Sequence, residues 1–211
     1  MNQNILKFYL YTNKLKETLR QGWVQIGINK ERLESVAEHV YGCMMLAIAI
    51  DSEYKLNLDM YKVLKMISIH ELDEILMPDF TIRDNITKEE RDALSMKDII
   101  KITDGLIKQD EIISLTNEFN ERKTKEAIFS YHIDKIECDL QAKIYDLKGV
   151  FSMDNAKEDL KYFGDKAKEI EENAKCASDI WIGYDISRFD DDPIFKSLIE
   201  DIKNLTKEDL R

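Results

Sequence analysis

The sequence has few residues of the kinds that interrupt helices. Only two prolines and seven glycines occur among 211 residues. Because proline and glycine are the strongest helix breakers and turn formers, their scarcity favours helices over hairpins. The composition therefore predicts an all-α fold, and the length predicts one domain, a single helical bundle over residues 1–211.

Cysteine is also scarce, and its spacing excludes two common kinds of stabilisation. Cys43, Cys138 and Cys176 are odd in number, lie far apart and form no CxxC pair. Neither a disulfide framework nor a structural zinc site is indicated. The N-terminal residues show no signal-peptide pattern, and no run approaches the ~18 apolar residues of a membrane span. We expect a cytoplasmic protein that does not enter membranes.

The chain lacks the positive charge that a nucleic-acid-binding protein needs. Its formal net charge is −11 and its calculated pI is near 4.9. Polymeric nucleic acid and anionic membranes attract basic surfaces, so neither is an expected partner. A small phosphate ester remains possible, because a single bound metal ion can supply the local positive charge that such a ligand requires.

Helix-start signals divide the chain into segments. Ser35 and Glu38 have the spacing of a capping box, as do Thr87 and Glu90. The run Asp190–Asp192 before Pro193 is typical of a helix start and lacks the spacing of a calcium loop. Helices are expected over residues 4–19, 35–53, 58–76, from 87 onward, 123–147, 154–175 and 193–205, with a loop at residues 21–23.

Histidine is as scarce as cysteine, with three copies. His39 follows Val36 by three residues and lies beside an apolar stripe, so it points to the buried side of its helix. A lone histidine in such a place is usually a hydrogen-bonded core residue. His70 and Glu71 lie near the end of a helix, before Pro78. The apolar residues 43–46 are interpreted as core packing.

Asp134 belongs to a charged helix in which its role has two interpretations. It shares a semi-buried stripe with Tyr131, Cys138, Gln141 and Tyr145, whereas Asp139 lies off that stripe. The alternative is an ordinary acid of a solvated face. His132 lies one position away from the stripe and is interpreted as an exposed or partly buried histidine.

Two imidazoles with carboxylates form a mixed nitrogen and oxygen donor set that suits a divalent ion. Such a set leaves positions open for water and substrate, which favours hydrolysis, and Mn, Co, Zn, Fe and Mg all remain possible. Glu74 follows Glu71 by three residues and His70 by four, which predicts that it shares their helical face and assists the leaving group. A surface carboxylate is the plain alternative for Glu74.

Three sequence blocks resemble the HD-domain metal-dependent phosphohydrolases, and within them the 5′-deoxynucleotidase branch. The blocks are Glu34–His39 (ESVAEH), His70–Glu74 (HELDE) and Asp134–Glu137 (DKIE), in the order and spacing of that family. The resemblance extends over residues 20–142. It implies an HD-type helical bundle, a small nucleotide substrate, one divalent metal ion and a homodimer.

The resemblance also implies roles for individual residues. His39, His70, Glu71 and Asp134 match the metal ligands, and Glu74 matches the catalytic glutamate. Asp79 matches an aspartate associated with the substrate sugar and the attacking water, although a plain loop residue is the alternative. Arg20 and Trp23 resemble a pair that shapes the nucleotide pocket, although Trp23 also suits simple packing.

The chain departs from the family pattern at the residue for which the family is named. Glu71 stands where aspartate is usual, and its extra methylene shifts the carboxylate by up to about 1 Å. Pro78 replaces a glycine before Asp79, and Ile82 replaces a frequent proline. Ile75 follows Glu74 without a second acid, which disfavours guanosine-polyphosphate hydrolysis, and the few histidines favour one metal over two.

Three functional hypotheses follow. The leading one is a metal-dependent phosphohydrolase that removes the 5′-phosphate from nucleoside monophosphates or their deoxy forms. The alternative is a catalytically weak HD-domain protein that binds a nucleotide or a partner because Glu71 has altered the metal centre. The third is a purely structural helical protein, which would bind no stoichiometric metal.

Overall fold

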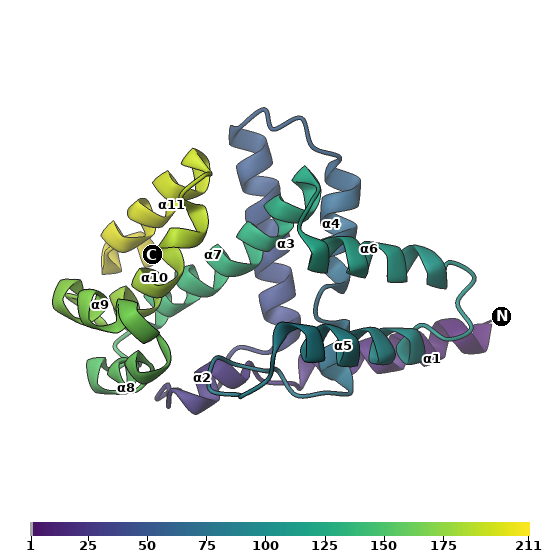
Figure 1. Ribbon diagram of the computed structural model, residues 1–211, viewed down its shortest axis with the longest axis horizontal. Helices are drawn as coiled ribbons and strands as arrows, with labels where there is room; N and C mark the ends of the chain where they lie inside the picture. The colour runs from purple at the N-terminus through teal and green to yellow at the C-terminus, as the bar shows by residue number, and fades with distance from the viewer. Residues whose placement is uncertain (1) are drawn as a thin grey trace. The chain divides into compact units, whose positions relative to one another are not determined.

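The computed structural model describes residues 2–211, which form α-helices and short 3₁₀ segments without an extended strand in that range (Figure 1). The α-helices are α1 (Asn2–Thr12), α2 (Gln21–Gln25), α3 (Val36–Glu53), α4 (Met60–Ile69), α5 (Lys88–Ile102), α6 (Gln109–Glu121), α7 (Lys125–Leu147), α8 (Met153–Lys157), α9 (Ala167–Asn173), α10 (Ala177–Asp185) and α11 (Pro193–Asn204). The predicted all-α class is confirmed. Over the described residues, every helix is too short or too polar to traverse a bilayer.

The helices gather into two compact units. The first contains the N-terminal residues through Gln21 together with Glu34–Ile133, and the second contains Gly22–Leu33 together with Asp134–Arg211. Helix α7 is continuous and passes from the first unit to the second at Asp134. The expectation that residues 1–211 form one domain stays a prediction.

The first unit is built around α3 and α4, which lie side by side (Figure 1). Its core collects buried side chains from α3 to α7 and from the 3₁₀ segments Asn13–Lys16 and Leu72–Ile75: Leu15, Val36, Met66, Ile69, Leu72, Ile99, Leu115, Phe119, Ala127 and Tyr131. Burying one such large apolar side chain stabilises the fold by about 1.5–3 kcal/mol. This core fixes the relative positions of the ends of α3 and α4.

Helix capping fixes where α3 and α5 begin, as predicted. The Ser35 hydroxyl accepts a hydrogen bond from the Glu38 amide, and the Glu38 carboxylate accepts one from the Ser35 amide. Thr87 and Glu90 form the same reciprocal pair at the start of α5. Losing such a cap costs about 1 kcal/mol. The expected start of α11 is also confirmed, because Asp192 accepts hydrogen bonds from the Ile194 and Phe195 amides.

Several long helices expected from the sequence are broken. The segment 4–19 is α1 followed by the 3₁₀ turn Asn13–Lys16, and residues 21–25 form α2 where a loop was expected. The prediction of one helix over residues 58–76 is wrong, because α4 ends at Ile69 and Glu71 has the non-helical angles φ −110° and ψ 19°. The segment 154–175 is divided among α8, α9 and short 3₁₀ turns, and Gly164 has a positive φ of 58° that disfavours a continuous helix.

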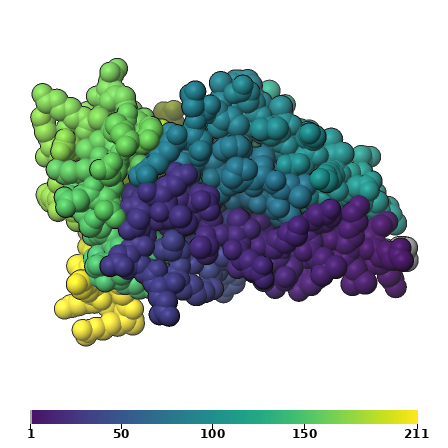
Figure 2. All heavy atoms as spheres, turned by 90° about the horizontal axis from the view of Figure 1, so that it is seen from below, coloured from purple at the N-terminus to yellow at the C-terminus, as the bar shows by residue number. Residues whose placement is uncertain are grey.

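Helix α1 lies along the surface of the first unit (Figure 2) and leaves an apolar face uncovered. The side chains of Ile5, Leu6, Tyr9 and Leu10 are each more than half exposed. Asn4 and Lys7 attach the helix by hydrogen bonds to Gly105 and Asp104. The helix is therefore held by polar contacts while much of its apolar surface faces outward.

The second unit has its own aromatic core. The Trp23 indole is 2% exposed, stacks on Trp181 with ring centroids 4.8 Å apart, and meets Tyr145 edge-on at 5.3 Å. Around it lie the buried residues Ile26, Ile28, Ala142, Phe151, Ala156, Phe163, Ile170, Ala177 and Ile180. This packing ties the short segment 22–33 to the later helices of the unit.

Helix α7 buries charge in the second unit, contrary to the stripe predicted for it. Asp139 was placed off the buried stripe, yet it is almost fully buried; His132, on the part of α7 in the first unit, is buried as well. No described N–H or O–H group donates a hydrogen bond to either Asp139 carboxylate oxygen. Burial and the nearby Asp185 carboxylate raise the pKa of Asp139 well above its ordinary value, while Arg188 and Lys135 oppose the shift.

This raised pKa predicts a pH-dependent stability defect. A carboxyl group that holds its proton more tightly in the folded chain than in the unfolded chain makes folding less favourable as pH rises above its ordinary pKa, here 3.8. Asp139→Asn should therefore stabilise the protein at pH 8 by about 1 kcal/mol, or about 2–4 °C in melting temperature, with little effect at pH 4. Asp190→Asn, at an exposed carboxylate, is the control. An equal effect of Asp139→Asn at both pH values would contradict the account.

Candidate metal centre

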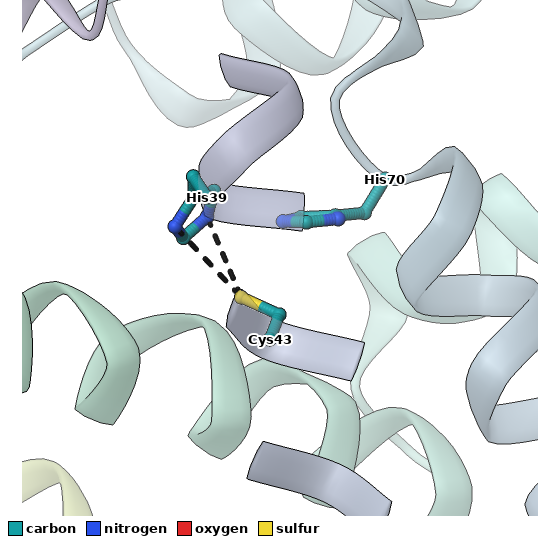
Figure 3. Close-up of side chains that lie close together, drawn as sticks. All are labelled: His39, Cys43 and His70. Carbon is teal, nitrogen blue, oxygen red and sulfur yellow. Dashed lines mark hydrogen bonds between the residues drawn. The ribbon is translucent and has the colours of Figure 1, made fainter. Parts of the chain in front are cut away.

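Two histidines meet inside the first unit. His39 lies on the first turn of α3 and is fully buried, and His70 immediately follows α4. Their rings lie 5.4 Å apart between centroids (Figure 3). Because α3 and α4 pack side by side, the first turn of α3 and the residue that follows α4 are brought together at one end of the helix pair.

The orientation of His70 is fixed by the end of its own helix. His70 Nδ1 lies 2.7 Å from the Ile67 carbonyl oxygen, which can only accept a hydrogen bond. Nδ1 therefore carries a proton, and in the neutral imidazole Nε2 is the nitrogen with the lone pair. A backbone carbonyl that holds the far nitrogen in this way is the usual support of a metal-binding imidazole.

Glu71 brings a carboxylate to both imidazoles. Its Oε1 lies 3.6 Å from His39 Nε2 and 3.4 Å from His70 Nε2. Two donors held about 2.0–2.2 Å from one tetrahedral ion lie about 3.4 Å apart, so these spacings fit ligands that share an ion. Glu74 Oε2, moreover, is buried and receives no hydrogen bond from the described residues. Buried acceptors and neutral imidazoles together fit a divalent cation.

Arg20 is the cation that faces this group of acids. Its Nη1 lies 3.0 Å from Glu71 Oε1, 3.6 Å from Asp79 Oδ2 and 3.8 Å from Glu74 Oε1. All four side chains are largely buried, with exposed fractions between 7% and 15%. At this burial the attractions are much less screened than they would be in water.

The backbone around Arg20 is itself anchored to the first unit. The Arg20 amide donates to the Glu34 carbonyl, and the Gln21 amide donates to Asp79 Oδ2 at 2.9 Å. Leu19 and Ser35 form an isolated antiparallel bridge beside them. Asp79 therefore holds the segment that carries Arg20, in addition to facing its guanidinium.

Crowding of carboxylates changes their protonation. Burial raises the pKa of Glu74 well above its ordinary value, the charges of Glu71 and Asp79 raise it further, and Arg20 opposes them. Burial and the Glu71 charge likewise raise the pKa of Asp73 to about 6, although a Ser95 hydrogen bond opposes the shift. Glu74 is thus inclined to hold a proton beside the candidate metal ligands, as a proton donor must.

The first unit brings together six of the eight residues predicted for the site: Arg20, His39, His70, Glu71, Glu74 and Asp79. The reason given for Glu74 was wrong, because it lies on the 3₁₀ segment Leu72–Ile75 and not on a continuation of the His70 helix. Trp23 and Asp134 belong to the second unit, where Trp23 is a core residue and Asp134 Oδ2 pairs with Lys135 at 2.8 Å.

Sequence reasoning missed two buried residues of this region. Asp73 was not considered, although it lies within the HELDE block. Cys43 was interpreted as core packing with residues 44–46, and its complete burial confirms this, but the contact of its sulfur with the His39 ring was missed; Met45, in contrast, is 42% exposed. The signal that could have singled out Cys43 is its position four residues after His39, on the same face of α3.

Comparisons with known proteins agree with these motifs. The model of the HD domain family matches residues 12–177. The 5′-deoxynucleotidase HDDC2 of Dictyostelium discoideum is 38% identical over 150 residues, covering 68% of this chain and 78% of that protein. The human 5′-deoxynucleotidase HDDC2 is 31% identical over 147 residues, covering 68% of this chain and 69% of that protein.

Solved structures share the fold. A conserved hypothetical protein from Pyrococcus furiosus superposes with a TM-score of 0.69 at 22% identity, covering 95% of this chain and 99% of that chain. A protein described as a predicted metal-dependent phosphohydrolase from Magnetospirillum magnetotacticum gives 0.64 at 18% identity, covering 96% and 90%. The family match over most of the chain and the 38% identity are decisive: this chain belongs to the HD-domain family.

Proposed function

We propose that this protein is a metal-dependent phosphohydrolase that removes the 5′-phosphate from nucleoside monophosphates, with deoxyribonucleotides preferred. The observation that carries the proposal is the convergence of His39 Nε2, His70 Nε2 and Glu71 Oε1 at spacings of 3.4–3.6 Å. Relatives named 5′-deoxynucleotidases support the substrate class. The acidic chain also suits a small phosphate ester better than a nucleic-acid polymer.

The proposed cofactor is one divalent ion, held by His39, His70, Glu71 and Asp134. Asp134 is included on its sequence block, DKIE, and on its place in α7 directly after Ile133, the last residue of the first unit. When bound, such an ion supplies Lewis-acid polarisation of a phosphoryl oxygen and lowers the pKa of water. Mn, Co, Zn, Fe and Mg are all compatible with a mixed imidazole and carboxylate set.

The neighbouring side chains have complementary roles in this proposal. Arg20 contributes the fixed positive charge that a phosphate group requires, and its planar guanidinium can bind two phosphate oxygens. Glu74, whose pKa is raised, delivers a proton to the departing sugar oxygen. Asp79 holds the Arg20 segment and orients water or the sugar. Trp23, which resembles a residue that shapes the nucleotide pocket in the family, is buried and stacks on Trp181.

We also propose that the protein is a cytoplasmic homodimer. Free thiols at Cys43, Cys138 and Cys176 are consistent with a reducing compartment. The exposed apolar residues of α1 offer a surface that a second copy could cover. Family resemblance favours a dimer over other assemblies.

The metal requirement predicts the outcome of a substrate panel. Metal-stripped protein should release no phosphate from 5′-monophosphates, and adding back divalent ions one at a time should restore turnover, with deoxyribonucleotides cleaved faster. His70→Ala should reduce kcat/KM by more than about 100-fold, the upper range for losing only a supporting group. His132→Gln, at the third histidine of the chain, is the matched control. Full activity without metal would overturn the proposal.

The substitution Glu71→Asp tests whether the site is built for glutamate. Glu71 Oε1 already contacts Arg20 and faces both imidazoles, so withdrawing the carboxylate by about 1 Å should lower kcat/KM by about 100-fold and weaken metal retention. Steady-state kinetics and metal analysis measure both effects, with the exposed Glu89→Asp as control. A large gain in activity would instead favour the alternative, an impaired enzyme whose role is binding.

The oligomeric state can be tested on α1 directly. Light scattering after gel filtration should give twice the 24.8 kDa mass of one chain. Leu6→Glu should shift the protein towards the monomer mass, because charge on a covered apolar face costs several kcal/mol. Gln3→Glu places the same charge elsewhere on the exposed helix and should leave the mass unchanged. A monomeric wild-type protein would refute the dimer.

A further inference from the structure

The 3₁₀ segment Leu72–Ile75 packs against α5 in the first unit. Apolar side chains of the core, including Leu72 and Ile99, come from both elements. Two polar side chains are nevertheless buried here, because Asp73 of the 3₁₀ segment is 8% exposed and Ser95 of α5 is 7% exposed. A polar group buried among apolar side chains destabilises the fold unless it is hydrogen-bonded. Both side chains therefore require partners.

Asp73 and Ser95 are partners of each other. The Ser95 hydroxyl donates a hydrogen bond to the Asp73 carboxylate, and bonds to a charged acceptor are about twice as strong as neutral ones. Ser95 lies in the middle of α5, away from the end that Thr87 caps, so its hydroxyl serves the contact between the two elements. Replacing such a pair by apolar groups of the same shape is often nearly neutral for stability. What the hydrogen bond adds is a fixed orientation of Asp73.

The orientation of Asp73 affects the residues that follow it. Its carbonyl oxygen accepts hydrogen bonds from the Leu76 amide at 3.0 Å and from the Met77 amide at 3.1 Å. Successive residues of a 3₁₀ segment project about 120° apart, because one turn contains three residues. With Asp73 turned towards α5, Glu74 therefore projects to another side of the segment, where its Oε1 lies 3.8 Å from Arg20 Nη1. A rotation of Asp73 would move Glu74 as well.

We propose that Asp73 and Ser95 are positioning residues for the reaction: their hydrogen bond fixes the rotation of the 3₁₀ segment and so holds the Glu74 carboxyl group at the candidate metal centre. The proposal rests on the proposed function, which assigns the delivery of a proton to Glu74. Two other roles compete with it. In the first, Asp73 acts on the metal centre only through its charge. In the second, the pair only stabilises the fold.

Substitutions that keep or remove the hydrogen bond separate these roles. Ser95→Ala removes the donor and should lower kcat by about 10–100-fold, since a misplacement of about 1 Å costs up to about 100-fold, while KM changes by less than about threefold. Asp73→Ala should have the same effect. Asp73→Asn keeps an acceptor for the Ser95 hydroxyl without the charge, so it should retain kcat to within about threefold.

The control is a serine that is equally buried in the first unit. Ser130 is fully buried, and its hydroxyl has no hydrogen-bond partner among the described residues, so Ser130→Ala should leave kcat unchanged. A loss of kcat in Asp73→Asn as large as that in Asp73→Ala would refute the proposal in favour of the charge. A lower melting temperature of Ser95→Ala with an unchanged kcat would refute it in favour of a purely structural pair.

Hydrogen exchange of the metal-free protein is a readout that does not depend on turnover. Ser95→Ala should speed the exchange of the Leu76 and Met77 amides by about tenfold, because the turn opens more often without the bond, while the amides of α3 keep their wild-type rates. Unchanged exchange at both amides would overturn the proposal.

The two measurements separate this proposal from the proposed function. If the wild-type protein releases phosphate with metal and Ser95→Ala equals it in kcat and in exchange, only the positioning proposal fails. If the wild-type protein releases no phosphate with any divalent ion, the proposed function fails and the catalytic role of Glu74 fails with it. Exchange then still decides whether the bond between Ser95 and Asp73 fixes the 3₁₀ segment.

Discussion

The ion pairs of Arg20 with three buried carboxylates are the interactions on which this site depends. Glu71, Glu74 and Asp79 all lie within 4 Å of one guanidinium nitrogen. Carboxylates removed from water repel one another strongly, and an unpaired buried charge costs several kcal/mol. Arg20 offsets part of this repulsion, and it opposes the rise in the pKa of Glu74 that burial and its acidic neighbours cause. The peptide hydrogen bonds that anchor Arg20 and Gln21 are therefore part of the electrostatics of the site.

The single positive charge of Arg20 does not neutralise three carboxylates. The remaining negative charge can be neutralised by a proton or by a metal ion. With all three acids ionised, two negative charges are in excess next to the two imidazoles. The raised pKa of Glu74 is one response to this excess, since protonation removes one of the charges. A divalent cation is the other response, and its charge equals the excess. A proton on Glu74 and a metal ion each neutralise the same excess negative charge, so protonation of Glu74 and metal binding oppose one another.

The break between α4 and the following 3₁₀ segment gives the donors their geometry. In a continuous helix, Glu71 would project about 100° around the axis from His70, and the two side chains would diverge. Glu71 instead leaves helical geometry, with φ −110° and ψ 19°, and its carboxylate turns towards both imidazoles. The same break frees the Ile67 carbonyl to receive the His70 Nδ1 proton. A local departure from regular structure therefore serves both ligands.

Local signals in the sequence predicted the parts of the fold that local physics determines. The capping pairs at Ser35 and Thr87, the start of α11 and the buried position of His39 all depend on residues within one or two turns of each other. The end of α4 was missed because residues 70–76 contain no glycine or proline, and tertiary packing overrode helix propensity there. The environment of Asp139 was missed because Asp185 and Arg188 are distant in sequence.

The order of the sequence motifs predicted which residues belong to the site. The contacts between those residues follow only from the folded structure. No pattern along the chain indicates that Arg20 faces residues 51 to 59 positions away, because that contact arises from long-range packing. Cys43 shows that one sequence pattern can also fit two different roles. A cysteine four residues after a histidine on an apolar helical face is what core packing requires, and it is also what a second ligand on that face requires. The position of the sulfur separates these alternatives: it lies 3.7 Å from Nε2 and 3.8 Å from Nδ1 of His39, and such nearly equal distances fit packing against the ring.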